Sequence, residues 1–236
     1  MDADMLSSAG NDFFTATVNS LFMIIVTELG DKTFFIAAVL AMRSGRLLVY
    51  SGAMLALGIM HIGSVLMGYA LPALLPRKYT HIASTLMFVY FGFRLLKDAY
   101  QMGDGPSDEL QEVEEELIKK KEGEEADVEV EETERGSNRN NIRSRSGDQL
   151  KVFTQALTLT FLAEWGDRSQ IATIAMAASK NPYGVILGGL VGHAFCTGLA
   201  VIGGRILAAR ISEKTVAITG GVLFLCFALH SFMVGP

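Results

Sequence analysis

Cysteine is nearly absent from this chain of 236 residues. Its two cysteines, Cys196 and Cys226, each lie within an apolar run rather than in a polar loop. A small scaffold held by disulfides carries an even, spaced set of cysteines in loop-rich sequence. The distribution therefore argues against a disulfide framework, and it leaves the redox compartment undetermined.

Basic residues are absent from the first dozen positions, which carry Asp2, Asp4 and Asp12 instead. A secretory signal begins with a basic region followed by a short apolar core, and neither is present here. We therefore expect the first transmembrane helix to direct insertion, or an upstream leader to be missing from this chain.

Acidic residues are scarce outside a single segment. Of the 25 acidic residues, 16 fall between Asp104 and Asp148, so the net charge of −5 describes that segment rather than the whole chain. Such a composition cannot bury enough apolar surface to offset the entropy of ordering. We predict that residues 102–150 form an acidic, largely disordered linker with a short helix around Glu109 to Lys121. A solvated tether is the simpler interpretation, and a regulatory or metal-buffering module is the alternative.

The rest of the chain is apolar, since half of all residues are hydrophobic and the mean hydropathy is positive. A helix needs about 20 apolar residues to cross the hydrocarbon core of a bilayer. By this criterion the sequence predicts an all-α polytopic membrane protein with six transmembrane helices, near 16–42, 48–71, 80–100, 152–178, 184–208 and 215–234. Most Lys and Arg residues lie on the side of the membrane that holds the linker, and this bias predicts that the linker is cytosolic. Both termini are then luminal, with residues 1–15 forming a short luminal N-terminus.

The membrane part is a sequence repeat. The motif Glu28-Leu29-Gly30-Asp31-Lys32-Thr33 recurs 136 positions later as Glu164-Trp165-Gly166-Asp167-Arg168-Ser169. Other residues match at the same offset, among them Val49 with Val185, Gly52 with Gly188 and Phe88 with Phe224. Because each half holds three predicted spans, the second half (151–236) enters from the side opposite to the first (16–101), which makes two inverted three-helix repeats. Transporters built in this way bind their substrate near the midplane, between the halves.

Four acids within apolar spans oppose membrane insertion by on the order of 10–14 kcal/mol in total unless they are paired or ligated. The spacing of three residues in each motif predicts that both carboxylates lie on one helical face. Glu28, Asp31, Glu164 and Asp167, with the hydroxyls of Thr33 and Ser169, then form an all-oxygen site. Such a site suits Ca²⁺, Mn²⁺ or Mg²⁺ and suits Zn²⁺ or Cu poorly, since no Cys or His is close in sequence.

The charges of this site predict competition between metal and protons. Four carboxylates with Lys32 and Arg168 nearby leave a net charge of −2, which one divalent cation or two protons neutralise. The alternative is that Glu28 pairs with Lys32, and Glu164 with Arg168, as i,i+4 locks of helix packing.

Four other residues in the spans leave alternatives open. Gly30 and Gly166 either permit close helix approach or free backbone carbonyls as ligands. His61 and His193 do not align in the repeat, and each either packs with a hydrogen bond or relays protons.

The paired Glu-x-Gly-Asp-(Lys/Arg)-(Thr/Ser) motif and the acidic middle loop resemble the transmembrane protein 165 family of Golgi cation/proton exchangers. The resemblance implies a Golgi transporter that brings Mn²⁺, and also Ca²⁺, from the cytosol into the lumen against protons, supporting glycosylation and Mn/Ca homeostasis. It also implies that Glu28, Asp31, Glu164 and Asp167 bind the ion, with Thr33 and Ser169 as supporting ligands.

We therefore predict a secondary antiporter rather than an enzyme, without catalytic residues, prosthetic group or nucleic-acid partner. Its partners are divalent ions, protons and the bilayer, and its oligomeric state is open. A passive divalent-cation channel is one alternative. A membrane-embedded metalloenzyme that activates water on the same carboxylates is another.

Overall fold

The computed structural model of the chain describes residues 3–74, 76–102, 111–115, 117, 119, 141–208 and 212–235. Its long helices are α1 (Ala3–Glu28), α2 (Lys32–Arg43), α3 (Arg46–Leu74), α4 (Arg77–Gln101), α6 (Asn141–Glu164), α7 (Arg168–Ser179), α8 (Pro182–Ala208) and α9 (Glu213–Val234). The described residues are helices joined by short connections, which confirms the predicted all-α fold.

Three of the described helices are long and apolar enough to cross a membrane: Arg46–Leu74, Pro182–Gly204 and Lys214–Met233. They correspond to the predicted spans 48–71, 184–208 and 215–234. The first and fourth predicted spans are each divided into two helices, and α4 carries the charges of Arg94, Lys97 and Asp98. The arrangement is that of a multi-pass membrane protein, and the full set of six spans stays a prediction.

The helices extend further than the apolar spans do. α1 begins at Ala3, well before the span predicted from 16, and α6 begins at Asn141, within the predicted linker. Helix propagation explains both extensions, because a helix that is already nucleated gains one hydrogen bond for each residue added. Most of the predicted disordered linker, 103–110, 116, 118 and 120–140, lies outside the described residues.

A short part of the linker is packed against the bundle. Residues 111–115, 117 and 119 are helical, in agreement with the predicted helix around Glu109 to Lys121. Val113 is fully buried and Leu117 nearly so, in the same apolar cluster as α2. These two residues are four apart and therefore share one helix face. The overall composition of the segment is acidic and therefore does not indicate that this apolar pair packs against the bundle.

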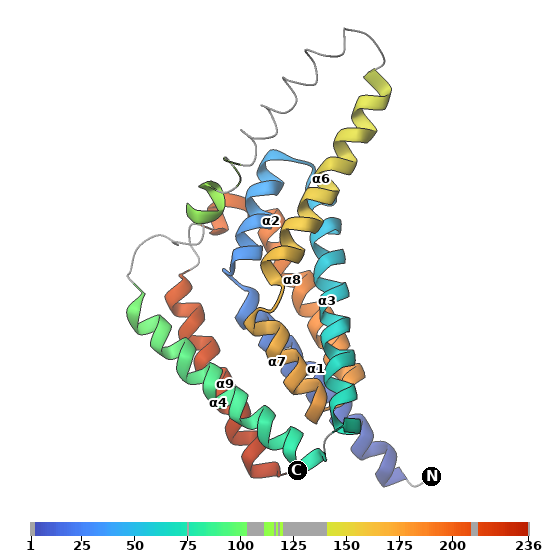
Figure 1. The fold of residues 1–236 in the computed structure, drawn as a ribbon, viewed down its shortest axis with the longest axis vertical. Coiled ribbons are helices and arrows are strands. Elements are labelled where there is room, and N and C mark those ends of the chain that lie inside the picture. The colour runs from blue at the N-terminus through green and yellow to red at the C-terminus, as the bar shows by residue number, and fades with distance from the viewer. Residues whose placement is uncertain are drawn as a thin grey trace.

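The bundle has two apolar clusters along its length. One gathers α2 with Val49 and Ala156, and the other gathers α1, α7 and the aromatic rings of α4 and α9. α1 packs along α8, and α3 packs along α6 and α7. α4 and α9 lie side by side at one edge of the molecule (Figure 1). The breaks between α1 and α2 and between α6 and α7 separate the two clusters along the chain.

Glycine allows two of these helix pairs to touch backbone to backbone. A Cβ atom added at Gly52 of α3 would lie 2.6 Å from the carbonyl oxygen of Phe153 in α6. One added at Gly188 of α8 would clash with the carbonyl oxygen of Thr17 in α1. Small residues permit such close approach between membrane helices.

Candidate metal centre

Both motif copies break a helix. α1 ends at Glu28 and α2 begins at Lys32, while α6 ends at Glu164 and α7 begins at Arg168. Between them Gly30 and Gly166 have φ values of 83° and 80°. This left-handed conformation is open to glycine at little cost. The amide of Asp31 donates to the carbonyl of Glu28 over 3.3 Å, and that of Asp167 donates to Glu164 over 3.2 Å, so both turns close alike.

These turns correct one sequence prediction. The two acids of a motif do not lie on one helical face, because the positive φ of the glycine ends the helix between them. The i,i+4 pairing of Glu28 with Lys32 assumes one continuous helix, whereas Glu28 ends α1, Lys32 begins α2 and Lys32 Nζ lies 3.3 Å from Glu112 Oε1. A tight turn brings the carboxylates together instead.

Replacing Gly166 tests the turn. A Cβ atom added there meets no described atom within 4 Å, so the cost of Gly166→Ala is conformational, about 1–2 kcal/mol. Gly166→Asn should cost less, because asparagine visits the left-handed region more readily. Thermal unfolding in detergent measures both, with Gly147→Ala, at a glycine that is equally open and lies within helix α6, as the control. An unchanged midpoint for Gly166→Ala would contradict the need for glycine.

Three carboxylates from the two halves converge at the breaks. One oxygen each of Glu28, Asp31 and Glu164 lies within 4.8 Å of the others. Glu28 and Glu164 are each only 3% exposed, and Asp31 is half-buried. Two oxygens on opposite sides of one Ca²⁺ ion lie about 5 Å apart, so the group has the dimensions of a single cation site. Carboxylates this close do not all stay charged without a cation or protons between them.

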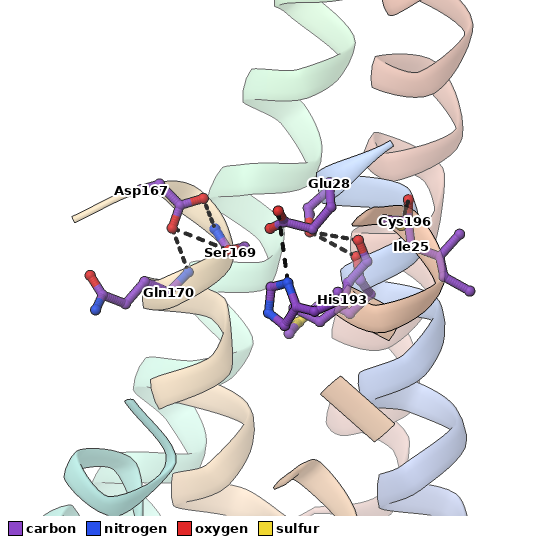
Figure 2. Close-up of polar contacts among 10 residues, drawn as sticks. Ile25, Glu28, Asp167, Ser169, Gln170, His193 and Cys196 are labelled. Atoms are coloured by element: carbon purple, nitrogen blue, oxygen red, sulfur yellow. Dashed lines mark hydrogen bonds and ion pairs between the residues drawn. The ribbon is translucent and has the colours of Figure 1, made fainter. Parts of the chain in front are cut away.

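Asp167 is held differently from Asp31. Its carboxylate caps α7 and accepts hydrogen bonds from the backbone amides of Gln170 (2.8 Å) and Ser169 (2.9 Å) and from the Ser169 hydroxyl (3.2 Å) (Figure 2). Asp31 occupies the same position on α2 without a side-chain cap hydrogen bond, and it joins the three-carboxylate group. The two motif copies are therefore alike in backbone and unequal in side-chain contacts.

The remaining predicted ligands lie in small cavities beside this group. Thr33 lines one with Glu28, and Ser169 lines another with Glu164 and Asp167. Each measures about 10 Å³, room for about one water molecule or small ion. The structure thus places all six predicted residues around the breaks, with three of them in the tight group.

A larger cavity of about 220 Å³ adjoins the site. Asp31 and Asp167 line it, together with Gly30 and Arg168, and Met102 at the end of α4 lines it too. Met102 directly precedes the linker, so the cavity lies at the linker end of α4. It therefore places two of the predicted ligands beside a space large enough for a hydrated ion.

The basic residues of the motifs pair with acids outside the motifs. Lys32 Nζ lies 3.3 Å from Glu112 Oε1 of the linker segment, and Arg168 lies 3.4 Å from Asp98 Oδ2 of α4. The sequence-based charge balance counted only motif residues. With Glu112 and Asp98 included, more of the basic charge is neutralised outside the carboxylate group, so a cation or protons must neutralise more at the site.

Sequence reasoning did not place a histidine here. His193 of α8 faces Glu28, with 3.9 Å between Nδ1 and Glu28 Oε2 (Figure 2). His61 of α3 stacks edge-on against His193 with ring centroids 5.3 Å apart, and its Nε2 lies 3.1 Å from the carbonyl oxygen of Val185. The available signal was two histidines in apolar spans, which does not specify what they face.

Several buried polar atoms at the site have no hydrogen-bond partner among the described residues. They are one oxygen each of Glu28 and Glu164, the hydroxyls of Thr160 and Thr173, and Nδ1 of His193. An unsatisfied buried polar atom costs about 1–3 kcal/mol, more when it is charged. Because these atoms lie close together, they are potential ligands of a bound metal ion.

Broken helices that bring buried carboxylates together inside an apolar helical bundle are typical of multi-pass membrane transporters of cations. The family profile described as "Divalent cation/proton antiporter GDT1" matches residues 16–103 and 152–235. The chain belongs to this GDT1 family, which confirms the resemblance drawn from the motifs. The family is one of transporters rather than enzymes.

Individual relatives agree over nearly the whole chain. GDT1-like protein 3 of Oryza sativa subsp. indica is 45% identical over 234 residues, covering 98% of this chain and 78% of the relative. GDT1-like protein 3 of Arabidopsis thaliana is 44% identical over 235 residues, covering 98% and 75%. A GDT1-like protein of Schizosaccharomyces pombe is 43% identical over 244 residues, covering 95% and 84%. No solved structure matches the chain.

Proposed function

We propose that this protein exchanges Mn²⁺, and also Ca²⁺, for protons across the Golgi membrane and moves the metal from cytosol to lumen. Glu28, Asp31, Glu164 and Asp167 bind the ion, with Thr33 and Ser169 as supporting ligands. The observation that carries the proposal is the convergence of the Glu28, Asp31 and Glu164 oxygens within 4.8 Å of one another at buried helix breaks. Membership in a family of divalent cation/proton antiporters supports the exchange.

The proposal includes six spans arranged as two inverted three-helix repeats. Reciprocal packing supports this arrangement. Gly52 packs on Phe153, and Gly188 packs on Thr17. The repeat offset of 136 relates Gly52 to Gly188 and Thr17 to Phe153, so the two contacts are equivalent. Likewise α3 packs along α6 as α8 packs along α1. A linker on the cytosolic side, with both termini luminal, completes the proposed topology.

Exchange follows from the charge of the site. A divalent cation replaces the protons that otherwise keep neighbouring carboxylates neutral, so metal and protons occupy the site in turn. The cavity lined by Asp31 and Asp167 lies at the linker end of α4 and provides a route for metal from that side. Movement of one half against the other then exposes the site to the lumen.

The alternatives fit the site less well. A passive channel needs a continuous open path, whereas Glu28 and Glu164 are each 3% exposed among the described residues. A metalloenzyme needs a nucleophile or base apart from the metal ligands. The three converging acids all belong to the repeated motif, as expected of ligands that two related halves supply.

Purified protein in proteoliposomes with an internal pH dye tests the function. With the membrane potential clamped, we expect Mn²⁺ and Ca²⁺ uptake to move protons outward and to run faster when the interior is acidic, because the outward proton gradient then drives metal inward. Protein-free liposomes control for leak. Metal entry without proton movement would favour the channel, and the absence of any uptake would overturn the proposal.

A further inference from the structure

His193 occupies a central place in the site. Its side chain is 3% exposed and lines both small cavities, the one with Glu164 and Asp167 and the one with Glu28 and Thr33. It therefore lies between the carboxylates of the two motif copies. No function is assigned to it by the repeat, since position 57, which corresponds to it, is a leucine.

The ring nitrogen that faces the carboxylates has no hydrogen-bond partner among the described residues. Nδ1 of His193 makes no hydrogen bond to any described residue, and neither does Oε1 of Glu28. The 3.9 Å between Nδ1 and Glu28 Oε2 is too long for a hydrogen bond. Two ligand atoms that each lie about 2.1 Å from the same metal ion are about 3–4 Å apart from each other. The distance between His193 Nδ1 and Glu28 Oε2 therefore suits two ligands of one cation.

His61 has the same residue type and a different setting. Its Nε2 lies 3.1 Å from the carbonyl of Val185, and this contact occupies the nitrogen. Its ring borders His193 and also lines the small cavity with Glu164 and Asp167. Of the two histidines, His193 alone also lines the cavity with Glu28 and leaves Nδ1 without a hydrogen bond to a described residue, so His61 serves as its matched control.

A nitrogen donor changes which cations a carboxylate site prefers. Ca²⁺ and Mg²⁺ take oxygen ligands almost exclusively, whereas imidazole is a common ligand of first-row transition metals. Building on the proposed function, we propose that His193 is a ligand of the transported ion and makes the site prefer Mn²⁺ over Ca²⁺ and Mg²⁺.

Pulsed electron paramagnetic resonance of the Mn²⁺-loaded protein tests the contact directly. Protein labelled with ¹⁵N only at histidine should show hyperfine coupling between Mn²⁺ and ¹⁵N. His61→Gln should keep this coupling and His193→Gln should lose it. Mn²⁺ bound without histidine coupling in the wild type, or no Mn²⁺ bound at all, would overturn the proposal. The wild-type spectrum decides the question even if His193→Gln fails to fold.

Competition between Mn²⁺ and Ca²⁺ uptake tests the consequence. Removing even an indirect partner of a metal ligand costs about 10–100-fold in affinity, so His193→Gln should lower the Mn²⁺/Ca²⁺ preference at least about tenfold. His61→Gln should leave the preference unchanged. An unchanged preference in His193→Gln would also overturn the assignment. If wild-type protein binds Mn²⁺ through histidine yet moves no protons during uptake, the exchange function fails and the ligand assignment stands.

Discussion

Glu28→Gln is expected to lower proton-coupled Mn²⁺ uptake at least about 100-fold, and Glu164→Gln to do the same. Each substitution removes a charge from the group in which the oxygens of Glu28, Asp31 and Glu164 approach within 4.8 Å. Removing one partner of a buried ionic contact costs about 3–5 kcal/mol, which corresponds to a factor of at least about 100. Initial uptake rates in proteoliposomes, normalised to the amount of folded protein, measure the loss.

The matched control is Glu112→Gln, which makes the same chemical change at an acid that is mostly exposed and pairs with Lys32. An exposed ion pair contributes about 0–1 kcal/mol, so this variant should transport nearly as well as the wild type. Equal losses in Glu112→Gln and Glu28→Gln would indicate a general effect of charge. Full transport by Glu28→Gln would remove that residue from the site.

Asp167→Asn separates ion binding from helix capping. Asparagine caps a helix about as well as aspartate does, because its one carbonyl oxygen can still accept from the amide of Gln170, although the Ser169 amide, which donates to the second carboxylate oxygen, loses its acceptor. We therefore expect unchanged thermal stability together with a large loss of Mn²⁺ uptake. Unchanged uptake would limit Asp167 to the start of α7.

Gly52→Ala and Gly188→Ala should each destabilise the protein by about 1–3 kcal/mol, the usual cost of an overpacked contact. The added methyl group meets backbone rather than a movable side chain: the carbonyl of Phe153 at 2.6 Å for Gly52, and that of Thr17 for Gly188. Relief requires α3 to move away from α6, or α8 away from α1, and α6 and α1 are the helices that end at the motif breaks. Transport should therefore fall along with stability.

Gly63→Ala is the control, because an added Cβ atom there meets no described atom within 4 Å. Gly63 lies in the interior of the same helix as Gly52, so its replacement should leave stability unchanged or raise it slightly. Midpoints of thermal unfolding in detergent compare the three variants. A normal midpoint for both Gly52→Ala and Gly188→Ala would show that the close contacts are not needed.

The sequence was sufficient to locate the acids. Glu28 and Glu164 stand out because a carboxylate in an apolar span is costly unless it is paired or ligated. For Gly30 and Gly166 the sequence left two roles open, close helix approach and the freeing of backbone carbonyls. The form of the break was not predictable in the same way. Spacing rules assume a continuous helix, so they placed Asp31 on the face of Glu28 rather than across a turn.

Contacts between distant segments were beyond sequence reasoning. Glu28 and His193 are 165 positions apart, and only the packing of α1 along α8 brings them together. The pairing of Arg168 with Asp98 likewise depends on where α4 ends. The burial of Val113 was not predicted, because the average composition describes the whole segment and not the one helix face that packs against the bundle.

The helix breaks also bring four helix ends to one place. The carboxyl ends of α1 and α6 carry partial negative charge from the helix macrodipole, and the amino ends of α2 and α7 carry partial positive charge. Glu28 and Glu164 are the last residues of the former pair, whereas Asp31 and Asp167 occupy the N-cap positions of the latter. The macrodipoles thus stabilise the aspartates as anions and repel the glutamate charges until a cation or a proton arrives. We expect the aspartates to act as permanent anchors and the glutamates to be the groups that alternate between metal and proton.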